Sequence, residues 1–149
     1  MTKRNYILFN QDMLALIKEG KKTMTRRPVK SRDCCYSDGD KLKVFMWDEE
    51  LDQFRKNRPE HFNTIVDNEK PELEIEVLSV KKESVCDISA GDLLSEGFPP
   101  VSGDPDGYLG NACQMQRFFD YWDGIYKGTD FETALCPEVW VVEFKIVEG

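Results

Sequence analysis

The sequence predicts an α+β fold with a largely antiparallel sheet that curls into a small barrel flanked by short helices. Runs of alternating apolar and polar residues, typical of strands, are mixed with short helical patterns. They do not follow the regular strand-helix alternation that builds a parallel sheet. The chain of 149 residues, 40% of them hydrophobic, is long enough for a hydrophobic core. We therefore expect one domain over residues 1–149.

The N-terminal part begins with a strand, a helix and a basic segment. Tyr6–Phe9 is a short apolar strand. Asn10 is a suitable N-cap for a helix that runs to about Glu19, and Gly20 provides its C-terminal stop. Residues 21–28 are rich in cations and close with proline. This composition favours a partly exposed turn or edge segment over a buried strand.

Two further strands and a short helix are expected in the middle of the chain. In residues 41–47 the side chains of Leu42, Val44 and Met46 alternate with those of Lys41, Lys43 and Phe45, which indicates a half-buried strand. Residues 48–72 are polar, and we interpret them as a long insertion with one short strand. Residues 73–82 alternate clearly and predict a strand. Ser89 then resembles the cap of a short helix over residues 90–96.

The C-terminal part is expected to contain a loop, a helix and a strand. Residues 99–110 hold three prolines and three glycines and predict a loop. Asn111 is interpreted as the cap of a helix with a broad apolar stripe that includes Phe118 and Trp122. Residues 139–147 place apolar side chains at every second position, which predicts a strand.

The charge of the chain is distributed unevenly. The 20 Lys and Arg and the 28 Asp and Glu residues give a net charge of −8. Because phosphate contacts need basic side chains, this charge argues against binding of long duplex DNA. Residues 1–32, however, contain nine basic and two acidic residues. This basic segment is either a short anion-selective site or a chance cluster of solvated charges.

No segment indicates a membrane protein. The apolar runs are far shorter than the roughly 20 residues that a membrane span needs. The apolar strand near the N-terminus is too short for the core of a signal peptide. We therefore expect a cytoplasmic protein that does not interact with membranes.

The cysteines and the single histidine exclude several kinds of site. An odd number of cysteines without a secretory signal predicts reduced thiols; the five are Cys34, Cys35, Cys86, Cys113 and Cys136. Adjacent Cys34 and Cys35 form a poor chelate, so we expect no metal and no cofactor. His61 lies in the polar insertion and is interpreted as solvated. This excludes mechanisms that depend on a catalytic histidine.

Three side chains are candidates for chemistry. Neighbouring cations are expected to lower the pKa of Lys22, and a lysine of lowered pKa can act as a base toward a hydroxyl. Thr25 lies within reach if the backbone turns between the two, whereas an extended strand places them on opposite faces. Glu96 ends a helix, where the dipole disfavours negative charge. A role in a site would explain this position, but the local pattern favours an exposed glutamate.

Several blocks of the sequence together resemble ASCH-domain proteins. In that family a helix ends in Gly-(Arg/Lys)-Lys-Thr-x-Thr-Arg-Arg, and residues 20–27 match this pattern. The match continues through residues 39–42 and 88–98. Residues 117–125 and 139–144 look most like the longer members carried by bacteriophages and prophages.

The resemblance implies a PUA-like fold, which is a small mixed β-barrel. It also implies that RNA or a modified nucleotide binds in a basic cleft formed by the signature segment. Trp47 or Tyr36 is then a candidate for stacking on a base. The ligand-binding residues expected from this segment are Lys21, Lys22, Thr23, Thr25, Arg26 and Arg27.

Two alternatives stay open beside nucleotide binding. A shorter branch of the family consists of metal-independent amidohydrolases that act on N4-acetylcytidine. The catalytic roles of that branch fall on Lys22, Thr25 and Glu96 of this sequence. The other alternative is a phage accessory protein that binds a host protein through the acidic surface of residues 33–149.

Overall fold

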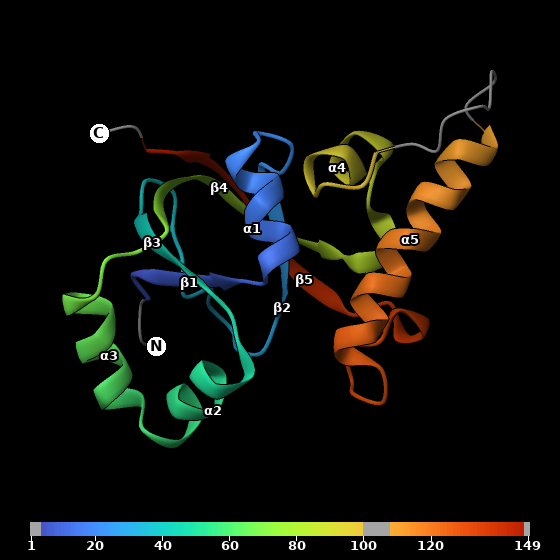
Figure 1. Ribbon diagram of the computed structural model, residues 1–149. Coiled ribbons are helices and arrows are strands. Elements are labelled where there is room, and N and C mark those ends of the chain that lie inside the picture. Colours follow the sequence, from blue (N-terminus) through green and yellow to red (C-terminus); the bar gives the residue numbers. More distant parts are fainter. Residues whose placement is uncertain (1–3, 100–107, 148–149) are drawn as a thin grey trace.

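The computed structural model describes residues 4–99 and 108–147, with side chains in these ranges except at 108–112. A five-stranded sheet forms the centre of the fold (Figure 1). The strands follow the order β1-β3-β4-β5-β2, and only β1 and β3 are parallel. Their bounds are β1 Tyr6–Phe9, β2 Met24–Pro28, β3 Lys41–Met46, β4 Leu73–Ser84 and β5 Glu138–Ile146. The predicted α+β class with a largely antiparallel sheet is confirmed.

Strand pairing does not close the sheet into the predicted barrel. β1 and β2 are the two outer strands of the sheet in the described part of the chain. They are linked by a side chain, since Arg27 Nη2 on β2 donates to the carbonyl oxygen of Leu8 on β1 at 2.9 Å. The two edges therefore face each other without a ladder of backbone hydrogen bonds, and they leave an open seam.

The described residues form five α-helices beside the sheet. In Figure 1, α1 lies over the strands, α4 and α5 flank the end formed by β5 and β2, and α2 and α3 lie beside β1 and β3. Their bounds are α1 Gln11–Lys18, α2 Glu49–Asn57, α3 Pro59–Asn68, α4 Ala90–Ser95 and α5 Tyr108–Tyr126. No helix in the described ranges has the length and apolar content that crossing a membrane requires.

The alternation of β5 divides the core between two sets of helices. Val142 and Phe144 belong to the cluster that contains the apolar stripe of α1. Val139 and Val141, which point to the opposite face of the strand, belong to the cluster that contains α4 and α5. Because both faces of β5 are buried, the strand is a central support for the site described below.

Residues 48–72 contain two helices, so the prediction of one short strand in this polar segment was wrong. Asp48 caps α2 by accepting a hydrogen bond from the backbone N–H of Leu51 at 2.7 Å. α3 begins with proline and buries Phe62 and Val66, which are four residues apart and therefore lie on one helix face. A helix needs only this narrow apolar stripe to dock, and the high polar content concealed it.

The basic segment and the last helix also differ from expectation. Residues 24–28 form an edge strand, as expected, but Met24, Thr25 and Arg26 are buried instead of partly exposed. The ion pairs described below compensate the burial of Arg26. α5 begins at Tyr108 and not at Asn111, so the last residues of the predicted 99–110 loop are helical. Residues 100–107 of that loop lie outside the described residues.

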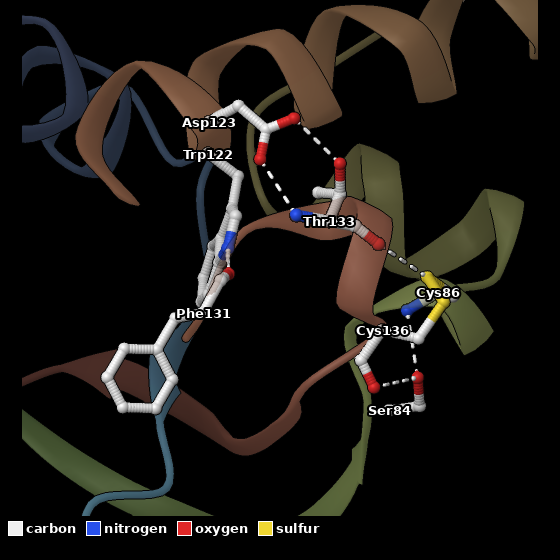
Figure 2. Close-up of a disulfide and its surroundings, with 7 residues drawn as sticks. All are labelled: Ser84, Cys86, Trp122, Asp123, Phe131, Thr133 and Cys136. Atoms are coloured by element: carbon white, nitrogen blue, oxygen red, sulfur yellow. Dashed lines mark hydrogen bonds between the residues drawn. A yellow bond between two sulfur atoms is a disulfide. The ribbon is translucent and has the colours of Figure 1, made fainter. Parts of the chain in front are cut away.

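A disulfide joins Cys86 to Cys136, so the expectation of five reduced thiols was wrong (Figure 2). The strand register explains the pairing. Ser84 of β4 pairs with Glu138 of β5, and two residues further along this antiparallel pair the cysteines face each other with Cα atoms 5.4 Å apart. Their separation of 50 residues hides this proximity in the sequence. Cys34, Cys35 and Cys113 are not disulfide-bonded within the described residues.

Candidate functional site

A buried ion cluster lies where the signature segment meets α4. Lys22 and Glu96 are 4% and 3% exposed. Lys22 Nζ donates to Glu96 Oε1 at 3.1 Å and to the Glu96 carbonyl oxygen at 2.9 Å. Arg26 Nη1 donates to the other carboxylate oxygen of Glu96 at 2.9 Å. The Glu96 carboxylate therefore compensates two buried cations, and the expectation of an exposed glutamate was wrong.

Local backbone geometry brings Glu96 to Lys22. Glu96 is the C-cap of α4, and Gly97 follows with φ of 101°, a left-handed conformation that favours glycine. A Cβ at position 97 would lie 2.8 Å from Leu16 Cδ1, so the glycine also permits α4 to approach the end of α1. The same end holds Lys22, whose backbone N–H donates to the Leu16 carbonyl oxygen at 3.2 Å.

Burial dominates the electrostatics of Lys22. Desolvation lowers the pKa of the Lys22 amine, while the charge and hydrogen bond of Glu96 oppose this shift. Arg27 and Arg26 lower the pKa of Lys22 further, but they are the smaller causes. The predicted direction agrees with the structure, whereas the predicted main cause, crowding by cations, is secondary.

Arg26 is paired with three carboxylates. Besides Glu96, it binds Asp92 Oδ2 at 2.8 Å and the carboxylate of Glu83. Burial opposes the charge of this guanidinium, but Glu96, Glu83 and Asp92 outweigh burial and raise the pKa of Arg26. Its Nε is buried and has no hydrogen-bond partner among the described residues. We infer that Arg26 positions these three carboxylates, including Glu96, which also binds Lys22.

Thr25 lies in the same site without bonding to Lys22. It is buried on β2 opposite Val142 of β5, and Lys22 precedes the strand by two residues. Both side chains line one cavity together with Glu96. Within the described part of the chain the Thr25 hydroxyl has no hydrogen-bond partner. It is thus available to a ligand.

The cavity has a volume of about 860 Å³ and occupies the seam between β1 and β2. This size lies within the range of about 300–1,000 Å³ found for small-molecule sites. Aromatic side chains form much of its wall: Phe9, Tyr36, Trp47, Tyr121, Tyr126 and Trp140. Lys21 and Thr23 do not line the cavity. Both are exposed, and Lys21 pairs with Glu19 at 3.1 Å.

Both predicted stacking residues line the cavity, but their environments differ. Trp47 is 42% exposed, so its ring is not an ordinary core side chain. Tyr36 is buried and donates its hydroxyl hydrogen to the Tyr6 carbonyl oxygen at 2.9 Å. Burial raises the pKa of the Tyr36 hydroxyl. Trp47 is therefore the better candidate for stacking on a base.

Comparisons with solved structures reveal the fold type. No family model and no curated protein matches this chain. An ASCH domain from Lactobacillus crispatus JV V101 superposes with a TM-score of 0.57 and 16% identity, covering 97% of this chain and 79% of its own. The chain has the fold of an ASCH domain.

Two further solved structures share this architecture. Protein EF3133 from Enterococcus faecalis V583 has a TM-score of 0.51 and 11% identity, with 99% of this chain and 82% of that chain covered. Hypothetical protein PH0355 has a TM-score of 0.54 and 13% identity, with 94% and 95% covered. At these identities the likeness establishes the architecture of this chain.

Sequence reasoning missed two polar residues of the site in this ASCH fold. Asn10 caps α1 as predicted, accepting from the Met13 N–H at 2.9 Å, but its Nδ2 also donates to the Tyr121 hydroxyl at 3.0 Å. Both Asn10 and Tyr121 line the cavity. No local signal marks this contact, because Tyr121 belongs to α5, which is 111 residues away in sequence.

We expect Cys35 in the cavity wall to be unusually reactive. A hydrogen bond from Cys34, with help from the Arg4 charge and against burial, lowers the pKa of Cys35 to about 6. Alkylation of Cys35 by iodoacetamide, followed by peptide mass spectrometry, should therefore rise around pH 6 and level off above it. The Cys34→Ala variant should move this midpoint upward. A wild-type midpoint near the ordinary value of about 8.5 would contradict the expectation.

Proposed function

We propose that this protein binds RNA or a modified nucleotide in the seam cavity. The main support for this proposal is that one cavity is lined both by aromatic side chains, such as Trp47, and by cations, such as Arg27. Unstacked bases bind to aromatic faces, and cations bind the accompanying phosphates. The net charge of −8 limits the contact to a short element such as a nucleotide, a loop or a single strand. The ASCH fold and the signature segment are consistent with this function.

Direct titration tests the proposal. N4-acetylcytidine and a short single-stranded RNA would be titrated into the protein by calorimetry at several salt concentrations, with heparin as an inert polyanion. We expect RNA to bind more tightly than heparin, with a shallow dependence on salt. Affinity for RNA that never exceeds the affinity for heparin would reject nucleotide recognition.

Removing the exposed aromatic of the cavity should weaken binding. Stacking contributes about 1–3 kcal/mol per base, so we expect Trp47→Ala to reduce affinity for RNA by about 5- to 150-fold. Leu78→Ala is the matched control, because Leu78 is also 42% exposed but lies on β4 outside the cavity. Equal affinities of the two variants would remove Trp47 from the site.

A second candidate function is amide hydrolysis on an N4-acylated cytidine. It is favoured by the hydrogen-bonded pair of Lys22 and Glu96, which shares the cavity with the unbonded Thr25 hydroxyl. In this proposal Lys22 acts in its deprotonated form, which its lowered pKa makes more accessible: the amine accepts the Thr25 proton, and Thr25 Oγ attacks the acyl carbonyl carbon. The C–N bond breaks, and the leaving amine takes the proton from Lys22. Water then hydrolyses the acyl ester and releases the free acid.

The hydrolase proposal has a simple test. The protein would be incubated with N4-acetylcytidine, and release of acetate and cytidine would be followed by chromatography. We expect Thr25→Ala and Lys22→Ala to abolish turnover, while Thr25→Ser retains part of it because serine keeps the hydroxyl. Turnover that is unchanged in Thr25→Ala would reject the covalent step, and absence of turnover in the unaltered protein would leave binding as the function.

A further inference from the structure

The adjacent arginines Arg26 and Arg27 of β2 differ in whether carboxylates compensate their charge. Arg26 is compensated by three carboxylates. Arg27 has no carboxylate partner among the described residues. Its Nη2 donates to the Leu8 carbonyl oxygen at 2.9 Å, and its Cζ lies 5.1 Å from the centre of the Phe9 ring. These contacts fix the orientation of the guanidinium and leave its other N–H groups available.

The Arg27 charge acts on several walls of the cavity. Burial lowers the pKa of Lys22, and the Arg27 charge lowers it further. Burial raises the pKa of Tyr121 and of Tyr126 on α5, and the Arg27 charge opposes both shifts. Arg27 therefore interacts electrostatically with side chains that line the cavity from different elements. A negatively charged ligand group would relieve the repulsion between Arg27 and Lys22.

Two other cations of the cavity also lack a carboxylate partner in the described ranges. Arg4 Cζ lies 5.8 Å from the Tyr6 ring centre, and Lys30 Nζ lies 5.9 Å from the Phe131 ring centre. The acids of the cavity are largely occupied. Asp52 binds Arg55 and Lys56, and Glu96 binds Lys22 and Arg26. Asp33 is the remaining acid that lines the cavity, together with the three cations Arg4, Arg27 and Lys30.

We propose that Arg27, assisted by Arg4 and Lys30, forms a subsite for the phosphoryl group of a nucleotide. This inference rests on the proposed nucleotide binding and specifies its ligand as phosphorylated. The planar guanidinium presents paired N–H donors whose spacing matches two oxygens of a phosphate group. The single carbonyl oxygen of a base accepts fewer of these donors. The base then lies toward Lys22 and Thr25, and the phosphoryl group lies toward Arg27.

Paired ligands that differ only in phosphate test this subsite. N4-acetylcytidine, its 5′-monophosphate and a short single-stranded RNA would be titrated into the full chain by calorimetry. We expect the monophosphate to bind at least about tenfold more tightly than the nucleoside. The Arg27→Gln variant should lose most of this ratio, and its circular dichroism spectrum checks that the variant is folded. Lys30→Ala, a change at an exposed side chain, should lower the ratio by a smaller factor.

A matched control and distinct outcomes separate this inference from the proposed function. Lys145 is exposed on β5 outside the cavity, so Lys145→Ala should leave the ratio unchanged. Equal binding of nucleoside and monophosphate by the unaltered protein would overturn the phosphoryl subsite and leave nucleotide binding intact. If the ratio of monophosphate affinity to nucleoside affinity is unchanged in Arg27→Gln and Lys30→Ala, the assignment of these residues to the subsite is overturned.

If none of the three ligands binds, the proposed function fails, and this inference fails with it. A preference for RNA over the monophosphate supports the subsite and identifies an oligonucleotide as the source of the phosphoryl group.

Discussion

We expect Glu96→Ala to lower the free energy of unfolding by about 3–5 kcal/mol, because it leaves two buried cations without their shared carboxylate. Lys22 and Arg26 both donate to Glu96, at 3.1 and 2.9 Å. Urea unfolding followed by circular dichroism measures the loss. Glu72→Ala is the matched control, since Glu72 pairs with Lys18 at 3.0 Å on the exposed surface. Surface pairs of this kind contribute about 0–1 kcal/mol.

Glu96→Gln separates charge from shape at the same position. The amide keeps the size of the side chain and one acceptor oxygen, but it removes the negative charge. We expect a loss of stability between those of Glu96→Ala and Glu72→Ala. If Glu96→Ala destabilises the protein no more than Glu72→Ala does, the buried cluster does not have the stabilising role that its geometry indicates.

The second large effect is expected at the disulfide. Cys136→Ser should lower the free energy of unfolding under non-reducing conditions by about 2–4 kcal/mol, because the bond between Cys86 and Cys136 restricts the unfolded chain over 50 residues. Figure 2 shows that the same region is tied to α5, where Asp123 accepts from the backbone N–H and hydroxyl of Thr133 at 2.8 and 2.7 Å. The bond therefore also supports the helix that forms one wall of the cavity.

Reductant and a second cysteine variant complete this test. Dithiothreitol should reduce the stability of the unaltered protein and have no effect on Cys136→Ser. Cys113→Ser is the control, because Cys113 is an exposed free thiol. Equal stability of the unaltered protein with and without dithiothreitol would contradict the assigned role of the bond.

Elements defined by neighbouring residues could be predicted from the sequence. The alternation of residues 73–82 and 139–147 is local, and the observed strands β4 and β5 cover most of both ranges. The helices at 49–57 and 59–68 could not be recognised in the same way. Each is polar along most of its length, and α3 is held by Phe62 and Val66 against side chains of β1 and β3, which the sequence does not place nearby.

The candidate site depended on tertiary contacts that the sequence did not contain. The family resemblance named Lys22, Thr25 and Glu96, but local reasoning favoured an exposed Glu96 because its partner Lys22 is 74 residues away. Similarly, nothing in the sequence distinguishes Arg26 from Arg27. Alternation along β2 turns Arg26 toward three acids, whereas Arg27 has no carboxylate partner among the described residues, and only the folded chain shows this difference. The catalytic and binding roles of these residues stay predictions.

The open seam between β1 and β2 links ligand binding to the mechanical closure of the sheet. Residues of both edge strands line the cavity, so a bound ligand would contact both strands at the place where a closed barrel would have backbone pairing. A free ligand concentration of 100 times the dissociation constant would add about 2.7 kcal/mol to the free energy of unfolding. We therefore expect a ligand that binds in this cavity to slow the exchange of the backbone amide hydrogens of both β1 and β2 with solvent. Hydrogen exchange of these two strands thus distinguishes a molecule that bridges the seam from one that does not.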